Sequence, residues 1–253
     1  MRDRFSSFGA AASAIAGGQD FGIVGPFPFR EVAAATEIDG AFEKLMQADR
    51  EVSIYSKEEA RLTEPKEMAT MLSRKLRGEG ILKPAEAENV SAYLDNLFQE
   101  LATSFKFCAK SVRIKTIRPF TENGIPCIDS SFKFHIDSPS PIIIVHTFHG
   151  TGTEIADVSE ETRHGFLRLY GQWQEGYRNY TYAKRQELIE LSRLMDELAQ
   201  SDNIVSLNKG ETAILRGNLG GPEMSTIHRA PWPLLSRLVM SISEVSLLHP
   251  TAA

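Results

Sequence analysis

The strongest constraint on the fold of this chain is a change of hydrophobic periodicity near residue 110. Before it, apolar residues recur with the 3.6-residue period of helices, as in the segment from Val90 to Phe105. After it, short runs with period 2 are separated by turn residues such as Asn123-Gly124 and Gly220-Gly221-Pro222. Many short strands with turn signals are typical of a sandwich or barrel. The chain is therefore predicted to fold as helices followed by a β-rich unit.

Three helices are predicted in the first half of the chain. The first covers about 32–45, with an interruption near Asp39-Gly40. The second begins at Pro65, runs to about Arg77 and ends at Gly78. The third begins at Pro84, because proline suits the first position of a helix, and its apolar residues repeat along one face.

The second half combines β-like runs with one helical insert. The runs cover residues 112–117, 130–137, 141–148, 152–156, 203–207, 211–216, 225–228 and 236–247. The insert covers about 158–201, where Leu188, Leu191 and Met195 form a helical stripe. These elements predict an α+β fold: a double-stranded β-helix core (jelly-roll or cupin-like) with N-terminal helices and a helical insert.

The same pattern divides the chain into three regions. Residues 1–28 loosely resemble a signal peptide, but Ala and Ser make a weak hydrophobic region and Asp3 dilutes the positive end, so a flexible, frayed or loosely helical N-terminus is expected. Residues 29–108 are expected to be a mainly helical region that packs on the barrel. Residues 109–253 then form the jelly-roll core, which carries the insert.

Composition excludes several classes of protein. The 253 residues are 42% hydrophobic and 24% charged, so the chain can bury a core of its own. The formal net charge of −5 argues against a nucleic-acid partner, and no apolar run approaches the ~20 residues of a membrane span. Cys108 and Cys127 form no zinc-binding or disulfide pattern. We expect a cytoplasmic protein that binds a small-molecule substrate, and leave homodimer formation open.

A His-x-Asp motif carries the chemistry. His135 and Asp137 are two residues apart on a β-like run, so both side chains face the same side. With His228 from a distant run they could form the two-histidine, one-carboxylate triad of non-haem Fe(II) oxygenases. The alternatives are a surface strand pair for the first two residues and a buried core histidine for His228.

Arg237 begins the last β-like run, after a turn that contains Pro231 and Pro233. A buried arginine beside a metal suits a carboxylate, which it can bind bidentately. Arg229 and Arg216 are alternatives, but on an extended strand Arg229 faces away from His228.

These motifs resemble the Fe(II)/2-oxoglutarate-dependent dioxygenase superfamily, and residues 110–245 look like the DUF1826 family. The matching pieces are Phe134-His-Ile-Asp137, Phe148-His-Gly-Thr-Gly-Thr-Glu154, Leu207-Asn-Lys-Gly210 and His228-Arg-Ala-Pro231. The departures are Ala230 in place of Ser and Phe148 in place of Tyr.

The resemblance implies that His135, Asp137 and His228 are the catalytic iron ligands and that Arg237 binds the distal carboxylate of 2-oxoglutarate. It also implies that O2 is the oxidant and that 2-oxoglutarate is the co-substrate. Superfamily halogenases have Gly or Ala at the position of Asp137, so the chemistry implied here is of the hydroxylase type.

The substrate is predicted to be a small polar metabolite such as an amino acid. Candidate contacts are Arg74, Glu122, His146 and Trp173, although each could be an ordinary surface or packing residue. Two other functions stay open: a metal cupin enzyme that needs no 2-oxoglutarate, and a non-catalytic binding module on the same fold.

Overall fold

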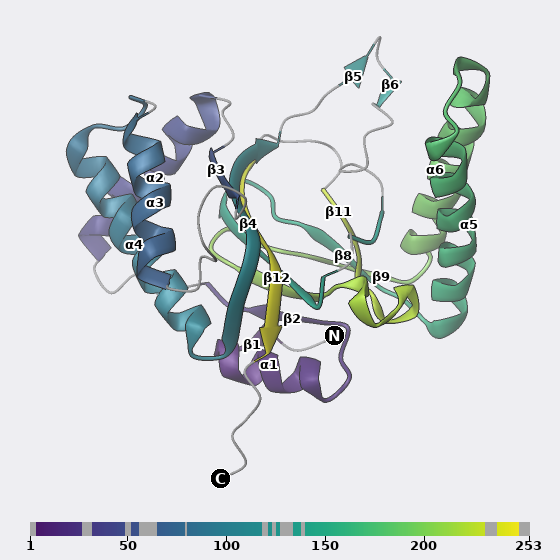
Figure 1. Cartoon of the computed structure of the whole chain (residues 1–253), viewed down its shortest axis with the longest axis horizontal. Helices are drawn as coiled ribbons and strands as arrows, with labels where there is room; N and C mark the ends of the chain where they lie inside the picture. The colour runs from purple at the N-terminus through teal and green to yellow at the C-terminus, as the bar shows by residue number, and fades with distance from the viewer. Residues whose placement is uncertain are drawn as a thin grey trace.

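A computed structural model describes residues 4–26, 32–48, 52–55, 65–78, 80–117, 121–122, 125–126, 134–137, 140–230 and 237–247. This part of the chain is a mixed α+β structure with six α-helices around β-sheets (Figure 1). The helices are α1 (Phe8–Ala16), α2 (Val32–Ala48), α3 (Pro65–Gly78), α4 (Pro84–Ala102), α5 (Glu160–Arg178) and α6 (Arg185–Gln200). None of them has the length and apolar composition of a membrane span.

A seven-stranded sheet forms the centre of the molecule, in the order β1-β2-β10-β7-β12-β4-β3. Its strands are β1 (Arg4–Phe5), β2 (Phe21–Val24), β3 (Val52–Tyr55), β4 (Phe105–Ile117), β7 (Ile142–His149), β10 (Thr212–Arg216) and β12 (Arg237–Leu247). Neighbouring strands are antiparallel except β1 and β2. The long β12 lies between β4 and β7, so it joins two segments that precede it in the sequence.

A three-stranded sheet has the order β11-β8-β9, made of β8 (Glu154–Asp157), β9 (Asn203–Ser206) and β11 (Ile227–Arg229). A separate two-stranded sheet pairs β5 (Thr121–Glu122) with β6 (Ile125–Pro126). Apolar side chains from the large and the small sheet, among them Val145, Ala213 and Ile155, form one buried cluster. The two sheets therefore pack against each other in this region.

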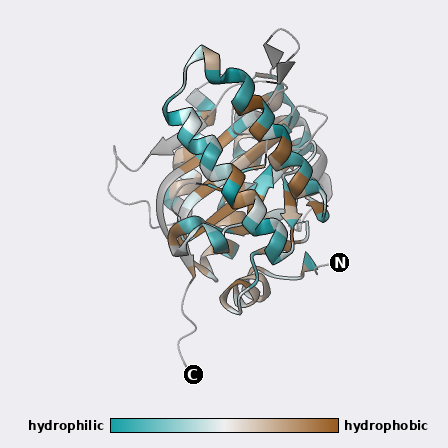
Figure 2. Ribbon diagram, turned by 90° about the vertical axis from the view of Figure 1, so that its right-hand side faces the viewer, coloured by the Kyte–Doolittle hydropathy of each residue, from teal (hydrophilic) through white to brown (hydrophobic). Residues whose placement is uncertain are grey.

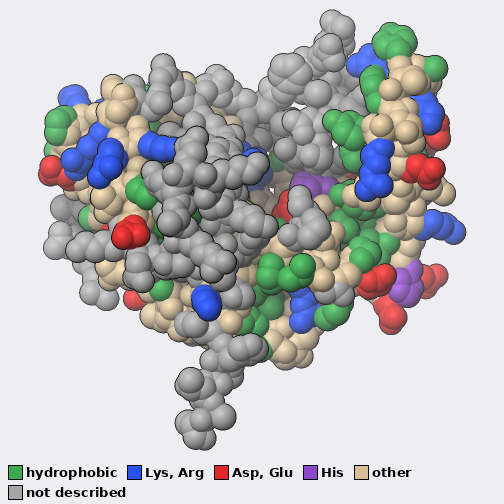
Figure 3. Space-filling view, viewed as in Figure 1, with side chains coloured by type: hydrophobic (Ala, Val, Ile, Leu, Met, Phe, Trp, Pro, Cys, Tyr) green, Lys and Arg blue, Asp and Glu red, His purple; other side chains and the backbone are tan. Residues whose placement is uncertain are grey.

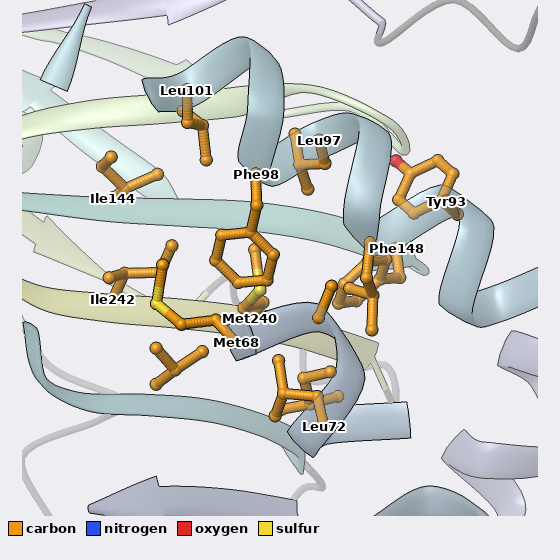
Figure 4. Close-up of a cluster of buried hydrophobic side chains, with 14 of the residues drawn as sticks. Met68, Leu72, Tyr93, Leu97, Phe98, Leu101, Ile144, Phe148, Met240 and Ile242 are labelled. Atoms are coloured by element: carbon orange, nitrogen blue, oxygen red, sulfur yellow. The ribbon is translucent and has the colours of Figure 1, made fainter. Parts of the chain in front are cut away.

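Helices α2, α3 and α4 cover the outer face of the large sheet. Phe98 and Leu72 from these helices pack against Ile144, Phe148 and Met240 of the sheet (Figure 4). All five side chains are buried, and such burial contributes ~1.5–3 kcal/mol for each large apolar residue.

Helices α5 and α6 form a hairpin on the outer face of the small sheet. Phe166 and Met195 from the hairpin pack against Ile227 of β11 and Ala156 of β8. Figure 2 looks onto the hairpin and shows hydrophilic positions alternating with hydrophobic ones along each helix, as expected for helices buried on one side.

The expectation of a flexible N-terminus over residues 1–28 is wrong for the described residues from 4 to 24. Ser7 caps α1, whose residues Phe8, Ala11 and Ile15 are buried, and β2 pairs with β10 in the large sheet. The Ala-rich stretch is a helix former with a narrow apolar face, and that face completes the core.

Most predicted elements are confirmed. The helices that begin at Pro65 and Pro84 lie where the sequence placed them, and β-like runs in the second half correspond to β4 and β7 to β12. The predicted interruption of the first helix is wrong, because α2 continues through Gly40. Ile38, Phe42 and Leu45 are buried on one face of this helix, which offsets the ~1 kcal/mol cost of an internal glycine. The strand β3 in the mainly helical region was not predicted.

Candidate metal site

The structure brings His135, Asp137 and His228 together. Each offers one ligand atom, and these atoms lie within 4.8 Å of one another. Nε2 of His135 is 3.8 Å from Oδ1 of Asp137, and Nε2 of His228 is 3.1 Å from Oδ2 of the same carboxylate. Among the described residues this is the one cluster of His, Cys, Asp and Glu side chains that could hold a metal ion.

Backbone pairing explains why the three side chains converge. His135 and His228 form an antiparallel bridge in which each N–H donates to the other's carbonyl oxygen, both at 3.0 Å. Directly opposed residues of an antiparallel pair face the same side. Asp137 follows His135 by two residues and shares that side.

The hydrogen bond that His228 makes through Nδ1 leaves its Nε2 as the nitrogen for a metal. Its Nδ1 donates to the carbonyl oxygen of Thr226 at 3.2 Å, so Nε2, which lies next to Asp137, is the nitrogen that can bind a metal once it has lost its proton. Metal-binding histidines are usually oriented in this way, by a bond from their second nitrogen. The donor set of two imidazoles and one carboxylate therefore fits a divalent transition metal.

Electrostatics in the site couple Asp137 to the histidines. Burial alone would raise the pKa of Asp137, but His228 and His135 outweigh it and hold this pKa well below its usual value. Burial alone would lower the pKa of His228, but the Asp137 carboxylate outweighs it and raises this pKa. The carboxylate is thus ionised, and without a metal a proton on His228 is its natural partner.

Arg237 lies at the start of β12 and is only 4% exposed. Its Nη1 donates to Oγ1 of Thr153 at 3.2 Å, while its Nε is buried without a hydrogen-bond partner among the described residues. Burial lowers the pKa of Arg237 to about 10, with Glu154 opposing the shift. Glu154 itself forms its ion pair with Arg229, at 2.7 Å.

Two more orphaned polar atoms lie on β7, next to β12 in the sheet. Oγ1 of Thr147 and Nδ1 of His149 are buried, and neither has a hydrogen-bond partner in the described part of the chain. His149 is paired with Leu238, the residue that follows Arg237. Buried polar groups usually find partners, so orphaned groups beside a buried cation are what a polar ligand would satisfy.

Arg229 behaves as the sequence predicted: it faces away from His228. It lies directly opposite Glu154 in the β8–β11 pairing and donates to it. It also donates to Oδ2 of Asp196, on α6, at 3.3 Å, and its Cζ lies 4.3 Å from the centre of the Phe134 ring. Arg229 is therefore not the carboxylate-binding residue of the site.

The structure does not bring His146 to the site. Its Nε2 is 2.6 Å from the Tyr93 hydroxyl and its Nδ1 is 2.8 Å from Oγ1 of Thr212. His146 is fully buried beside Phe148, on the face of β7 that α2 and α4 cover. The expectation that it contacts substrate is corrected here, because both nitrogens already have protein partners and the side chain faces the helices.

The remaining candidate contacts are scattered. Arg74 is exposed on α3, outside the metal cluster. Trp173 is a buried residue of α5 and stacks between Tyr170 and Tyr177 of the same helix. Glu122 lies in β5, and its side chain is outside the described residues. Their substrate contacts stay predictions.

Two hydrogen bonds that the sequence did not predict support the metal-binding segment. The hydroxyl of Tyr170, on α5, donates to the carbonyl oxygen of Ile136 at 3.0 Å, between the two ligands of the motif. Oδ1 of Asp196 accepts from the backbone N–H of Phe134 at 2.9 Å. No local sequence pattern predicts either bond, because each joins a helix to the extended segment around His135, more than 30 residues away.

A hollow gives access to this region. Figure 3 shows it between the helices of the large sheet and the α5–α6 hairpin, with histidine and acidic side chains visible inside it. His135 and Asp137 are partly exposed, whereas His228 is buried. A small molecule could therefore approach the cluster from the side of the His-x-Asp motif.

Comparisons with known proteins add little. No protein-family model matches the chain, and no curated protein does, so the resemblance to the DUF1826 family rests on the quoted motifs alone. A solved structure, the non-heme iron oxygenase OrfP in complex with Fe, aligns with 94% of this chain and 89% of its own. The sequence identity is 10% and the TM-score is 0.26, too low to support an argument about fold or function.

Proposed function

We propose that this protein is a non-haem Fe(II)- and 2-oxoglutarate-dependent oxygenase that hydroxylates a small polar metabolite such as an amino acid. One observation carries the proposal: two histidines and one carboxylate from distant segments converge within 4.8 Å on a partly open site. This donor set, with coordination positions left for other ligands, is that of the non-haem Fe(II) oxygenases.

The strand order supports a double-stranded β-helix for the core. Along the chain, β4 and β7 lie in the large sheet, β8 and β9 in the small one, β10 in the large, β11 in the small and β12 in the large. His135, between β4 and β7, pairs with β11 of the small sheet. Such alternation between two facing sheets is expected when antiparallel strands wind into a jelly roll.

In this proposal His135, Asp137 and His228 hold the iron, and each has a defined task. Asp137 contributes the negative charge, which its depressed pKa keeps available. The bond from Nδ1 to Thr226 fixes the ring of His228 with Nε2 towards the metal. When bound, iron supplies the activation of dioxygen, with 2-oxoglutarate as the co-substrate that is oxidised to succinate and carbon dioxide.

Arg237 is the residue proposed to bind 2-oxoglutarate. Its buried guanidinium has an Nε without a hydrogen-bond partner among the described residues and donates to Thr153, and His149 pairs with the next residue, Leu238. A carboxylate placed there would accept two parallel N–H bonds, which gives both affinity and orientation. The low exposure of Arg237 also keeps water from competing for these bonds.

The test is anaerobic addition of Fe(II) and 2-oxoglutarate to the purified protein. The proposal expects the weak absorption band of a metal-bound keto acid in the visible range, and succinate once air is admitted. Asp137→Ala should abolish the band, whereas His146→Gln, at a buried histidine outside the site, should keep it. No band with the wild-type protein would refute the proposal.

Two results would favour the alternatives. Metal binding without any band or succinate would indicate a metal cupin enzyme that does not use 2-oxoglutarate. A cellular function that survives alanine at all three ligands would indicate a non-catalytic binding module.

A further inference from the structure

We propose that Arg229 and Asp196 are positioning residues of the metal site, which hold its two histidine-bearing segments at the separation that a metal requires. This inference rests on the metal ligands of the proposed function and is independent of 2-oxoglutarate. Neither residue is a member of the metal cluster: Arg229 projects from the face of β11 opposite to His228, and Asp196 belongs to α6.

Asp196 links the two segments with a single carboxylate. Oδ1 accepts from the N–H of Phe134, the residue before His135, at 2.9 Å. Oδ2 accepts from Nη1 of Arg229, the residue after His228, at 3.3 Å. The mutual backbone bonds of His135 and His228 join the same segments on the other side. Each histidine is thus adjacent to a residue that α6 holds in place.

Arg229 completes the link and is 8% exposed. Its guanidinium lies between Glu154 of β8, at 2.7 Å, and Asp196 of α6, and its Cζ is 4.3 Å from the Phe134 ring centre. Two carboxylates therefore share one buried cation, which also packs on the neighbour of the first histidine. Charge-assisted bonds of this kind are strong and directional, and removing the cation would take the bonds of Arg229 from both carboxylates.

The arrangement makes metal binding and docking of the α5–α6 hairpin depend on each other. If α6 holds the histidines in the metal-binding geometry, a bound metal must in return stabilise α6 on the sheet, because linkage between two equilibria is reciprocal. The hairpin that borders the hollow is then tightened by the metal, even though it supplies no ligand.

The experiment measures Co(II) binding, by calorimetry and by the visible absorption of the bound ion, in wild type, Arg229→Met and Asp196→Asn. The Asp196→Asn change keeps the size of the side chain but replaces one acceptor oxygen by an N–H donor, so one link is lost. Both variants are expected to bind Co(II) roughly 10- to 100-fold more weakly, the usual cost of losing an outer partner of metal ligands, and to change its absorption spectrum. Arg229→Lys, which keeps the charge, should recover part of the affinity.

The matched control is Arg193→Met, which removes exposed ion pairs with Glu190 and Glu197 on the same helix and should leave Co(II) binding unchanged. Wild-type affinity and spectrum in folded Arg229→Met and Asp196→Asn would overturn this proposal while leaving the proposed function standing. If those variants fail to fold, hydrogen exchange in the wild type decides: protection of α6 on Co(II) addition supports the coupling, and unchanged exchange refutes it. A wild-type protein that binds no Co(II) would refute the metal site and this inference together.

Discussion

A substitution of Arg237 can show whether this buried arginine serves ligand binding or the stability of the fold. Its guanidinium is 4% exposed, makes one hydrogen bond to Thr153 and leaves Nε unsatisfied. A buried charge carries a desolvation penalty of roughly several kcal/mol, and a charge with an incomplete set of partners regains only part of it. For a chain of this length each kcal/mol shifts the melting temperature by about 2–4 °C. Arg237→Met should therefore melt at the wild-type temperature or a few degrees higher.

The same variant should lose affinity for 2-oxoglutarate. Truncating one partner of a buried charge pair costs about 2–5 kcal/mol, which corresponds to roughly 30- to 4,000-fold in the dissociation constant. Anaerobic calorimetry with the metal-loaded protein measures this loss, and differential scanning calorimetry of the metal-free protein measures stability. A lower melting temperature together with unchanged 2-oxoglutarate affinity would refute the reasoning, because Arg237 would then serve the fold.

Arg163 is the matched control, because it is a buried arginine whose two terminal nitrogens both bind groups of the protein. It donates to the backbone carbonyl of Ser225 and forms an ion pair with Asp20. Arg163→Met should lower the melting temperature, since it leaves a carboxylate and a carbonyl without their donor. Affinity for 2-oxoglutarate in the folded fraction should not change.

Three further predictions concern the surroundings of the metal. Co(II) affinity should fall about tenfold for each pH unit below the raised pKa of His228, because the proton that Asp137 stabilises on this histidine must leave before a metal can bind. Titration calorimetry over a series of pH values measures this slope, and an affinity that does not change with pH would contradict the prediction. Gly152→Ala should lower the melting temperature markedly, since its new Cβ would lie 2.4 Å from Cβ of Leu207; an unchanged thermal scan would be a contradiction. Tyr170→Phe removes the hydrogen bond to the carbonyl oxygen of Ile136, between two of the metal ligands. The free energy of unfolding in urea should fall by about 1 kcal/mol and Co(II) should bind more weakly. Unfolding and Co(II)-binding curves equal to those of the wild type would show that Tyr170 does not support the metal-binding segment.

The His-x-Asp part of the metal cluster could be predicted because it depends only on local strand geometry, whereas His228 was assigned through the motif resemblance. Side chains that are two residues apart on an extended segment lie on the same face, so His135 and Asp137 lie side by side wherever this segment is extended. Arg229 was assigned to the opposite face from His228 by the same rule, and its pairing with Glu154 confirms this.

The same rule fails where both faces of a strand are buried. Almost every residue of β7 is buried, so its sequence does not show which alternate residues face the site and which face the helices. His146 falls on the helical side, where Tyr93 and Thr212 take its nitrogens. Contacts such as that of Asp196 with Phe134 depend on how the hairpin docks, which periodicity does not encode.

The position of β12 has a consequence for how this protein is made. The strand lies between β4 and β7 in the large sheet, yet it follows every other strand of both sheets in the sequence. While the chain is being synthesised, β4 and β7 therefore expose unpaired edges until β12 leaves the ribosome, and Arg237 arrives with it. Closing such long-range pairs is slow, because chain entropy is lost before the contacts form. The large sheet, and with it the position of Arg237, is thus completed only when β12 pairs with β4 and β7, and the exposed edges favour aggregation until that step.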